Sequence, residues 1–316
     1  MSDTQTLTDT SGGWNQKALP HPQPFSRGAK GVNSLSRRER VGVRESGFTL
    51  VEMVTVIVIT GIIGGIVASF IKAPVQGYID SVRRAELTDI ADTAVRRMAR
   101  DIRTAVPNSV RIANCGATPC VEFLPTKDGG RYRADTPGNV LNFGVADGSF
   151  DIVGTAINFA ANDFIVIGST QSDGNPPYST AAAGILRAYT GVAGAQTSVN
   201  FNATALPVWA ELPSQRFDVV DGAQQAVTYA CENLGTDANG EGTGQLRRYA
   251  GYGFNAAQAN PPAGGASAIL ADRVSGCAIV YDLPSQRFGL VSVRLTLTRS
   301  NESVSLYNEI HVNNAP

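Results

Sequence analysis

The sequence predicts an α+β protein in which a long N-terminal helix packs on a mostly antiparallel β-sheet domain. Three observations predict this class. An apolar run covers residues 48–71, residues 72–106 carry apolar side chains at helical spacing, and short β-branched runs separated by Gly, Pro, Asn and Asp follow. Apolar residues three or four positions apart indicate a helix, whereas short runs between turn-forming residues indicate strands.

Residues 1–47 differ in composition from the rest of the chain. They are rich in Ser, Thr, Gly, Pro and Arg, and they lack the apolar periodicity of a helix or a strand. Such a composition predicts a disordered segment. The segment ends in a basic cluster formed by Arg37, Arg38, Arg40 and Arg44.

Residues 48–71 predict a single membrane-spanning helix. At 1.5 Å per residue the run is about 36 Å long, and a hydrocarbon core is about 30 Å thick. The arginine cluster before the run outweighs Lys72, Arg83 and Arg84 after it, which favours a cytoplasmic N-terminus and a periplasmic globular domain. An ordinary secretory signal peptide fits poorly, because the run is too long and no small-x-small site follows.

Residues 72–106 predict an amphipathic helix. Pro74 is expected to kink it, and Pro107 with Asn108 is expected to end it. One apolar face is formed by Leu87, Ala91, Ala94, Met98, Ile102 and Ala105. We expect this face to pack on the globular domain.

Residues 107–316 predict a β-rich globular domain. The candidate strands are residues 110–114, 120–124, 140–144, 150–154, 163–168, 226–231, 277–283, 290–299 and 304–312. The hexapeptide LPSQRF occurs twice, at Leu212–Phe217 and at Leu283–Phe288. Each copy precedes an apolar run, so the repeat predicts two equivalent turns in one sheet.

The four cysteines predict two disulfides in an extracytoplasmic domain, because an even number of cysteines outside the cytoplasm favours pairing. Pairing Cys115 with Cys120 and Cys231 with Cys277 is the most economical of three connectivities. A zinc site is the competing interpretation, but the spacing lacks a paired C-x-x-C.

The segment Gly47-Phe48-Thr49-Leu50-Val51-Glu52 resembles the class III signal of type IV prepilins. The resemblance implies that a prepilin peptidase removes residues 1–47 as a basic leader and N-methylates Phe48. Glu52 then becomes the fifth residue of the mature chain. It also implies a pilin-like fold, in which residues 48–71 form the filament core.

Glu52 needs a partner or a proton, because an ionised carboxylate in a bilayer costs about 2.5 to 3.5 kcal/mol or more. In the pilin family the partner is the free amino terminus of a neighbouring subunit, and the pair fixes axial register during assembly. The alternative is a protonated Glu52 near the lipid headgroups without any partner.

Residues 73–112, 215–231 and 292–316 resemble the MSHA biogenesis protein O family, minor pilins of the mannose-sensitive haemagglutinin pilus. This resemblance implies a minor pilin that acts in pilus biogenesis, in a priming complex of the inner membrane or at the tip of the extracellular pilus. The implied partners are the prepilin peptidase and methyltransferase, other major and minor pilins, and the inner-membrane assembly platform.

Catalytic motifs are not found in the sequence, and His311 is the only histidine after Gly47. The sequence therefore predicts neither an enzyme nor a cofactor or metal site, although an enzyme based on two carboxylates stays open. The segment DANGEG, Asp237–Gly242, partly resembles the start of a calcium loop. Its twelfth position is Arg248 instead of Glu, which favours a glycine-rich turn.

The net charge of the chain argues against one class of partner, nucleic acid. A formal net charge of −1 gives no general basic character, so nucleic acid is not a predicted partner. Two other functions share some of these features. One is a minor pseudopilin of a type II secretion system, and the other is a membrane-tethered periplasmic enzyme or carbohydrate-binding module.

Overall fold

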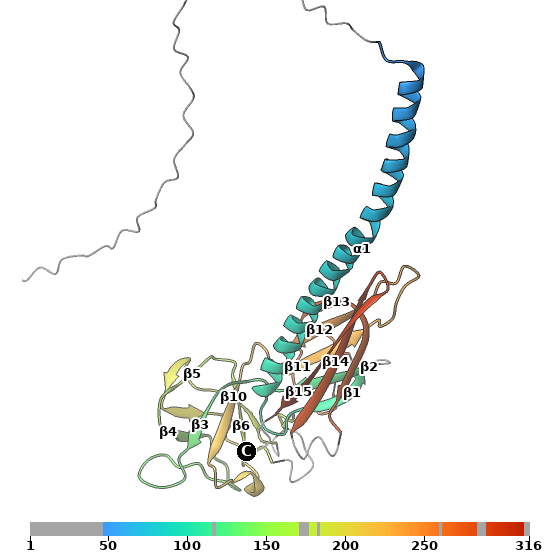
Figure 1. Ribbon diagram of the computed structural model, residues 1–316. Helices are drawn as coiled ribbons and strands as arrows, with labels where there is room; N and C mark the ends of the chain where they lie inside the picture. The colour runs from blue at the N-terminus through green and yellow to red at the C-terminus, as the bar shows by residue number, and fades with distance from the viewer. Residues whose placement is uncertain are drawn as a thin grey trace, which may run out of the picture. The chain divides into compact units, whose positions relative to one another are not determined.

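The computed structural model of the protein describes residues 47–115, 118–170, 177–181, 184–258, 261–282 and 289–312 (Figure 1). Of the predicted leader, only Gly47 lies within these residues. The contacts divide the chain into two compact units, Met1–Ile62 and Ile63–Pro316, with the boundary inside the first helix.

The one α-helix among the described residues, α1, spans Leu50–Arg103 and continues through Pro74. It ends three residues before the predicted end at residue 106. The reason is a competing set of backbone partners: Val106 donates to the carbonyl of Leu124 at 2.8 Å, and Thr126 donates to the carbonyl of Thr104 at 2.7 Å. Thr104 and Ala105 form a final turn, in which they donate to the carbonyls of Asp101 and Ile102. The N–H of Val106 then bonds to Leu124, so it is not available to continue the helix.

The larger of the sheets contains seven antiparallel strands in the order β1-β2-β11-β12-β13-β14-β15. Their bounds are Arg111–Cys115 for β1, Thr118–Phe123 for β2, Val227–Glu232 for β11, Gly244–Ala250 for β12, Ala266–Val280 for β13, Leu290–Arg299 for β14 and Glu302–His311 for β15. Ser300 and Asn301, both with positive φ, form the two-residue turn between β14 and β15, the kind of turn that matches the twist of paired strands.

The C-terminal half of α1 packs on this sheet, as the sequence predicts (Figure 1). All six residues of the predicted face are buried, and Val95 and Ala99 widen the stripe. They join one hydrophobic core with side chains of β2 and β11–β15. Burying one large apolar side chain contributes about 1.5 to 3 kcal/mol, so this face fixes the helix on the sheet.

A second sheet contains six strands in the order β7-β6-β10-β3-β4-β9, and β5 pairs separately with β8. The bounds are Thr126–Tyr132 for β3, Ser149–Val153 for β4, Ile157–Phe159 for β5, Phe164–Ile167 for β6, Leu186–Ala188 for β7, Gly194–Gln196 for β8, Ser198–Asn200 for β9 and Arg216–Val220 for β10; a 3-10 helix covers Val208–Ala210. Aromatic residues form much of a separate core under this sheet, among them Tyr132, Phe150, Phe159 and Phe217.

Two expectations about the sheets are wrong. Residues 140–144 form no strand; Asn142 instead donates its backbone N–H to the Asp147 carboxylate at 2.8 Å in a local turn. The LPSQRF repeat does not mark one sheet, because β10, which includes the end of the first copy, and β14, which follows the second, lie in different sheets. Residues 283–288 themselves lie outside the described residues.

Asp218 gives the six-stranded sheet a pH-dependent stability. It lies in the central strand β10 opposite Gly129. Burial raises the pKa of its carboxyl from 3.8 to about 6, although the nearby Arg216 guanidinium opposes the shift. Because the folded chain then binds this proton more tightly than the unfolded chain, the contribution of Asp218 to stability is most favourable below about pH 4 and is lost as pH rises through about 6.

The variant Asp218→Asn is therefore expected to unfold with a higher free energy than the natural chain at pH 7, by about 1 to 3 kcal/mol, and to differ little at pH 4. Urea titrations of the detergent-solubilised chain at both pH values measure the difference. Asp128→Asn, at an exposed position on the neighbouring strand β3, is the control. If the Asp218→Asn variant gains no stability at pH 7, the raised pKa of Asp218 in the folded chain is contradicted.

Candidate processing and assembly site

The predicted processing site lies immediately before α1. Gly47, Phe48 and Thr49 are not helical, and α1 begins at Leu50. The Phe48 side chain is 81% exposed, and a Cβ added at Gly47 would have no neighbour within 4 Å. The Gly47–Phe48 peptide bond is thus outside the hydrogen-bonded helix and open to a peptidase.

Thr49 caps the N-terminus of α1, a feature that the sequence analysis missed. Its hydroxyl oxygen accepts the backbone N–H of Glu52 at 3.3 Å, and its carbonyl accepts the N–H of Met53 at 3.2 Å. Thr-x-x-Glu is the pattern of a capping box, in which the glutamate can return a hydrogen bond to the cap residue. The capping-box pattern thus gives the Glu52 side chain a second, local hypothesis beside the predicted assembly role.

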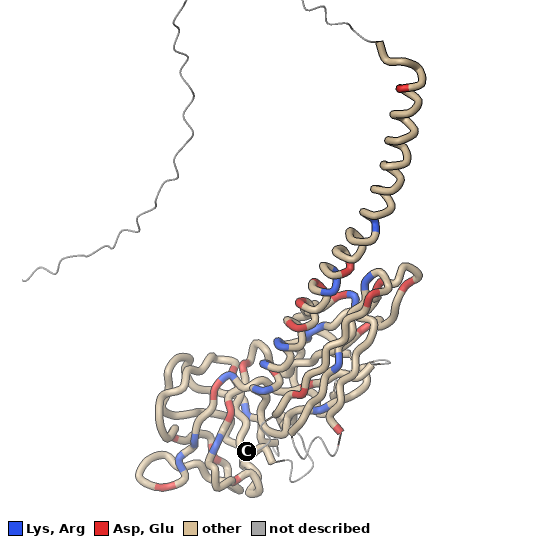
Figure 2. The backbone as a smooth tube through the Cα atoms, in the orientation of Figure 1, with Lys and Arg blue, Asp and Glu red and all other residues tan. Residues whose placement is uncertain are grey.

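The N-terminal half of α1 is long and apolar enough to cross a membrane. Its most apolar window has a mean hydropathy of 2.5, and none of that window is buried in the structure. The large apolar side chains between Phe48 and Ile71 are all exposed. Few charged residues lie along this part of the helix, whereas many lie along its C-terminal part (Figure 2). Such a surface needs lipid or other apolar helices around it.

The four cysteines form two disulfides, Cys115–Cys120 and Cys231–Cys277. The first closes the short loop between β1 and β2. The second joins β11 to β13 across the intervening strand β12, and Cys231 is fully buried in the core beneath α1. This local arrangement leaves no free cysteine among the described residues.

Removing the two disulfides is expected to have unequal effects, because a crosslink restricts the unfolded chain more when it closes a longer loop. The sequence separations are 46 residues for Cys231–Cys277 and 5 for Cys115–Cys120. The double variant Cys231→Ala with Cys277→Ala is expected to lose about 4 kcal/mol, and the matched variant of the short loop about 2 kcal/mol. Urea midpoints of the two variants test the order, and a reversed order would contradict it.

The DANGEG segment forms a turn between β11 and β12 whose acids have partners within the protein. Asp237 accepts the backbone N–H groups of Asn239 and Glu241, each at 2.8 Å. These hydrogen bonds, that from Glu241 first, lower the pKa of the Asp237 carboxyl. Glu241 accepts the N–H and hydroxyl of Ser300, both at 3.1 Å. The two carboxylates thus stabilise adjoining hairpin turns.

Glu122, an acidic residue of β2, is fully buried. Arg111 donates to it at 2.5 Å and Tyr252 at 2.7 Å. Arg111 also donates to the carbonyls of Asn255 and Ala256, both at 2.7 Å. Burial raises the pKa of Glu122, while the hydrogen bond from Arg111 lowers it. The pair holds the loop after β12 against β1 and β2.

Asp101 anchors the end of α1 to the sheet. Its carboxylate accepts the Tyr229 hydroxyl at 2.7 Å and the Arg248 guanidinium at 3.0 Å. Burial, together with the adjacent Asp101 charge, raises the pKa of Tyr229. Arg248 is the residue that occupies the twelfth position of the partial calcium-loop pattern, and here it serves helix packing.

Within the described residues, no three His, Cys, Asp or Glu side chains gather closely enough to hold a metal ion. The exposed His311 ends β15. Each of the polar groups described above has hydrogen-bond partners within its own cluster, so these contacts explain how the elements pack together.

The family described as the prokaryotic N-terminal methylation motif matches residues 43–68. No curated protein and no solved structure matches the chain. The matched residues include the Gly47–Phe48 bond, the cap at Thr49, Glu52 and most of the exposed apolar run. This motif implies processing by a prepilin peptidase and an inner-membrane anchor. The chain thus carries the N-terminal signal of a type IV pilin-like or pseudopilin-like protein.

Proposed function

We propose that the protein is a minor type IV pilin that acts in pilus biogenesis after cleavage at Gly47–Phe48 and methylation of Phe48. It joins an inner-membrane priming complex or the pilus tip, with residues 107–316 in the periplasm, and performs no chemistry itself. The resemblance of residues 73–112, 215–231 and 292–316 to the MSHA biogenesis protein O family favours the MSHA pilus.

The observation that carries the proposal is the methylation motif at the start of a helix with two contrasting halves. The half that contains the motif exposes its apolar side chains, whereas the other half buries its apolar stripe in a sheet. A subunit that moves from a bilayer to a filament core needs an apolar helix available to new neighbours. The β-rich domain must stay folded during that move, and the buried stripe of α1 keeps the helix fixed to its sheet.

Intact-mass measurement of the mature chain tests the proposal. Membranes and sheared filaments are taken from cells with and without the prepilin peptidase. We expect a chain that begins with methylated Phe48 when the peptidase is present, and the full leader when it is absent. A leader that is retained in the presence of an active peptidase would reject the assignment.

The same signal serves minor pseudopilins of type II secretion systems, so the test includes both assembly systems. Deleting the pilus assembly platform is expected to remove the mature chain from the sheared filament fraction. Deleting the type II secretion platform is expected to leave it there. The opposite result would favour the pseudopilin function and reject the pilus.

A further inference from the structure

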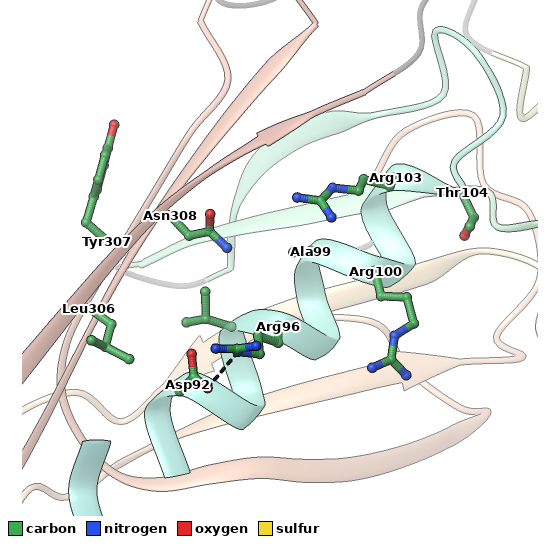
Figure 3. Close-up of a pocket in the computed structure, with 10 residues that line it drawn as sticks. Asp92, Arg96, Ala99, Arg100, Arg103, Thr104, Leu306, Tyr307 and Asn308 are labelled. Carbon is green, nitrogen blue, oxygen red and sulfur yellow. Dashed lines mark ion pairs between the residues drawn. The ribbon is translucent and has the colours of Figure 1, made fainter. Parts of the chain in front are cut away.

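A groove of about 750 Å³ separates the last turns of α1 from the strand β15. Both belong to the unit Ile63–Pro316. The helix side is lined by Asp92, Val95, Arg96, Ala99, Arg100, Arg103 and Thr104, and the strand side by Leu306, Tyr307 and Asn308. In Figure 3 the side chains of Arg103 and Asn308 extend into the space between helix and strand.

The strand side of the groove is the open edge of the seven-stranded sheet. In the part of the chain that the structure describes, β15 pairs with β14 alone. Their register runs without a shift from Leu290–His311 to Arg299–Glu302, and β15 contains no proline. Proline, bulges and short length are the features that usually prevent an edge from pairing with another chain. The edge of β15 is long and regular, so it can accept a further strand.

The helix side of the groove carries a row of positive charge. Arg96, Arg100 and Arg103 follow one another at intervals of four and three residues, which places them along one side of α1. Arg96 pairs with Asp92 at 2.6 Å. Among the described residues, no acid pairs with Arg100 or Arg103.

Ion pairs join α1 to the turn end of the β14–β15 hairpin. Arg84 pairs with Glu302 of β15 at 2.9 Å, and Glu86 pairs with Arg299 of β14 at 2.6 Å. The groove opens further along, beside Tyr307 and Asn308, where the sheet offers Arg100 and Arg103 no carboxylate. The acid of β15 that is nearest in sequence to Tyr307 and Asn308 is Glu309. Its carboxylate accepts the Tyr307 hydroxyl at 2.6 Å instead of pairing with an arginine of α1.

We propose that this groove binds an extended, acidic segment of another polypeptide, which adds to the edge of β15 as a further antiparallel or parallel strand. Its backbone would hydrogen-bond to β15, and carboxylates on alternate residues would pair with Arg100 and Arg103. Alternate residues of a strand lie about 6.6 Å apart on one face, and residues three apart on a helix about 5 to 6 Å, so the two spacings match.

A second copy of β15 does not provide this pattern. Its acids, Glu302 and Glu309, are seven residues apart and therefore project from opposite faces of the strand. The occupant is thus expected to be a different segment. If the proposed function is correct, the partner is another pilus subunit. That identity alone rests on the proposed function, whereas the chemistry of the groove is independent of it.

Fluorescence anisotropy of a labelled peptide tests the inference on the full chain in detergent micelles. The probe is acetylated Val-Glu-Val-Glu-Val-Glu-Val, and we expect saturable binding that weakens as salt increases. Arg100→Glu combined with Arg103→Glu is expected to weaken binding at least about ten-fold. A peptide with lysine in place of each glutamate is expected to bind this double variant better than it binds the natural chain.

Two matched controls separate strand addition from general charge attraction. Arg131→Glu with Arg216→Glu reverses an exposed arginine pair that lies opposite in β3 and β10, and it is expected to leave the affinity unchanged. A probe methylated on alternate backbone nitrogens keeps its charge but loses its donors, and it is expected to lose at least about ten-fold in affinity.

Equal binding of the methylated probe, or undiminished binding to the Arg100 and Arg103 variant, would overturn the inference. So would light scattering that shows a dimer of the chain that excludes the probe. Circular dichroism confirms that each variant remains folded, as expected for exposed side chains. Because the assay needs neither cleavage nor a filament, retained binding with failed processing would reject only the proposed function.

Discussion

Replacing Gly47 with leucine is expected to leave the whole population of the chain uncleaved, with its leader attached. The structure separates this effect from misfolding. A Cβ atom added at position 47 would meet no described atom within 4 Å, and the residue precedes the first turn of α1. We therefore expect a leucine here to leave the folded domain intact and to act on recognition by the peptidase.

Immunoblots of membranes check this prediction by the mobility of precursor and mature chain. Gly64→Ala provides the matched control, because an added Cβ at Gly64 likewise meets no atom within 4 Å. The control is expected to be processed like the natural chain. Efficient cleavage of the leucine variant at the same bond would show that the class III signal is not what directs processing.

Replacing Glu52 with glutamine is expected to reduce incorporation into filaments by about ten-fold or more, while membrane insertion stays normal. Glutamine keeps nearly the same shape but cannot bear the charge that pairs with a neighbouring amino terminus. An ion pair shielded from water contributes more than about 1.4 kcal/mol, the equivalent of a ten-fold change. The ratio of sheared-filament to membrane signal measures the loss.

The glutamine variant also distinguishes the assembly role from a capping role of the Glu52 side chain, which the Thr-x-x-Glu pattern allows. Glutamine serves in a capping box as well as glutamate does, so a purely local role predicts a normal glutamine variant. Glu52→Ala removes both the charge and the capping side chain and is expected to fail as well. Normal incorporation of both variants would favour a simple membrane anchor, as in a tethered enzyme or binding module.

Expectations that rested on neighbouring residues in the chain agree well with the structure. The stripe from Leu87 to Ala105 is buried, because an apolar period of three to four residues can be satisfied only by one helix face. The Thr49 cap was equally visible in the Thr-x-x-Glu pattern before the apolar run, although it was missed. The family match at residues 43–68 rests on the same kind of local order.

Expectations about the β-rich domain agree less well, because a strand pattern does not state its partner. Strand β2 pairs with β11, more than one hundred residues later in the chain, and nothing in either strand identifies the other. The strands β3 and β12 were not predicted, since glycine or arginine interrupts their apolar alternation. The strands β5, β7, β8 and β9 were not predicted either, because a strand of three residues is too short to show an alternation. The LPSQRF repeat shows the same limit, since the strands β10 and β14 next to its two copies lie in different sheets.

The sequence by itself determined the processing signal, the membrane-spanning run and the buried helix face, because each depends on residues within a few turns of one another. Only the tertiary structure decided the second sheet, the burial of Asp218 and the groove beside β15. These features arise where distant segments meet, and the free energy of each depends on which surfaces exclude water together. In the sequence, Arg100 and Arg103 are two arginines on the polar side of a helix, and they line a groove only because the edge strand β15 lies beside them.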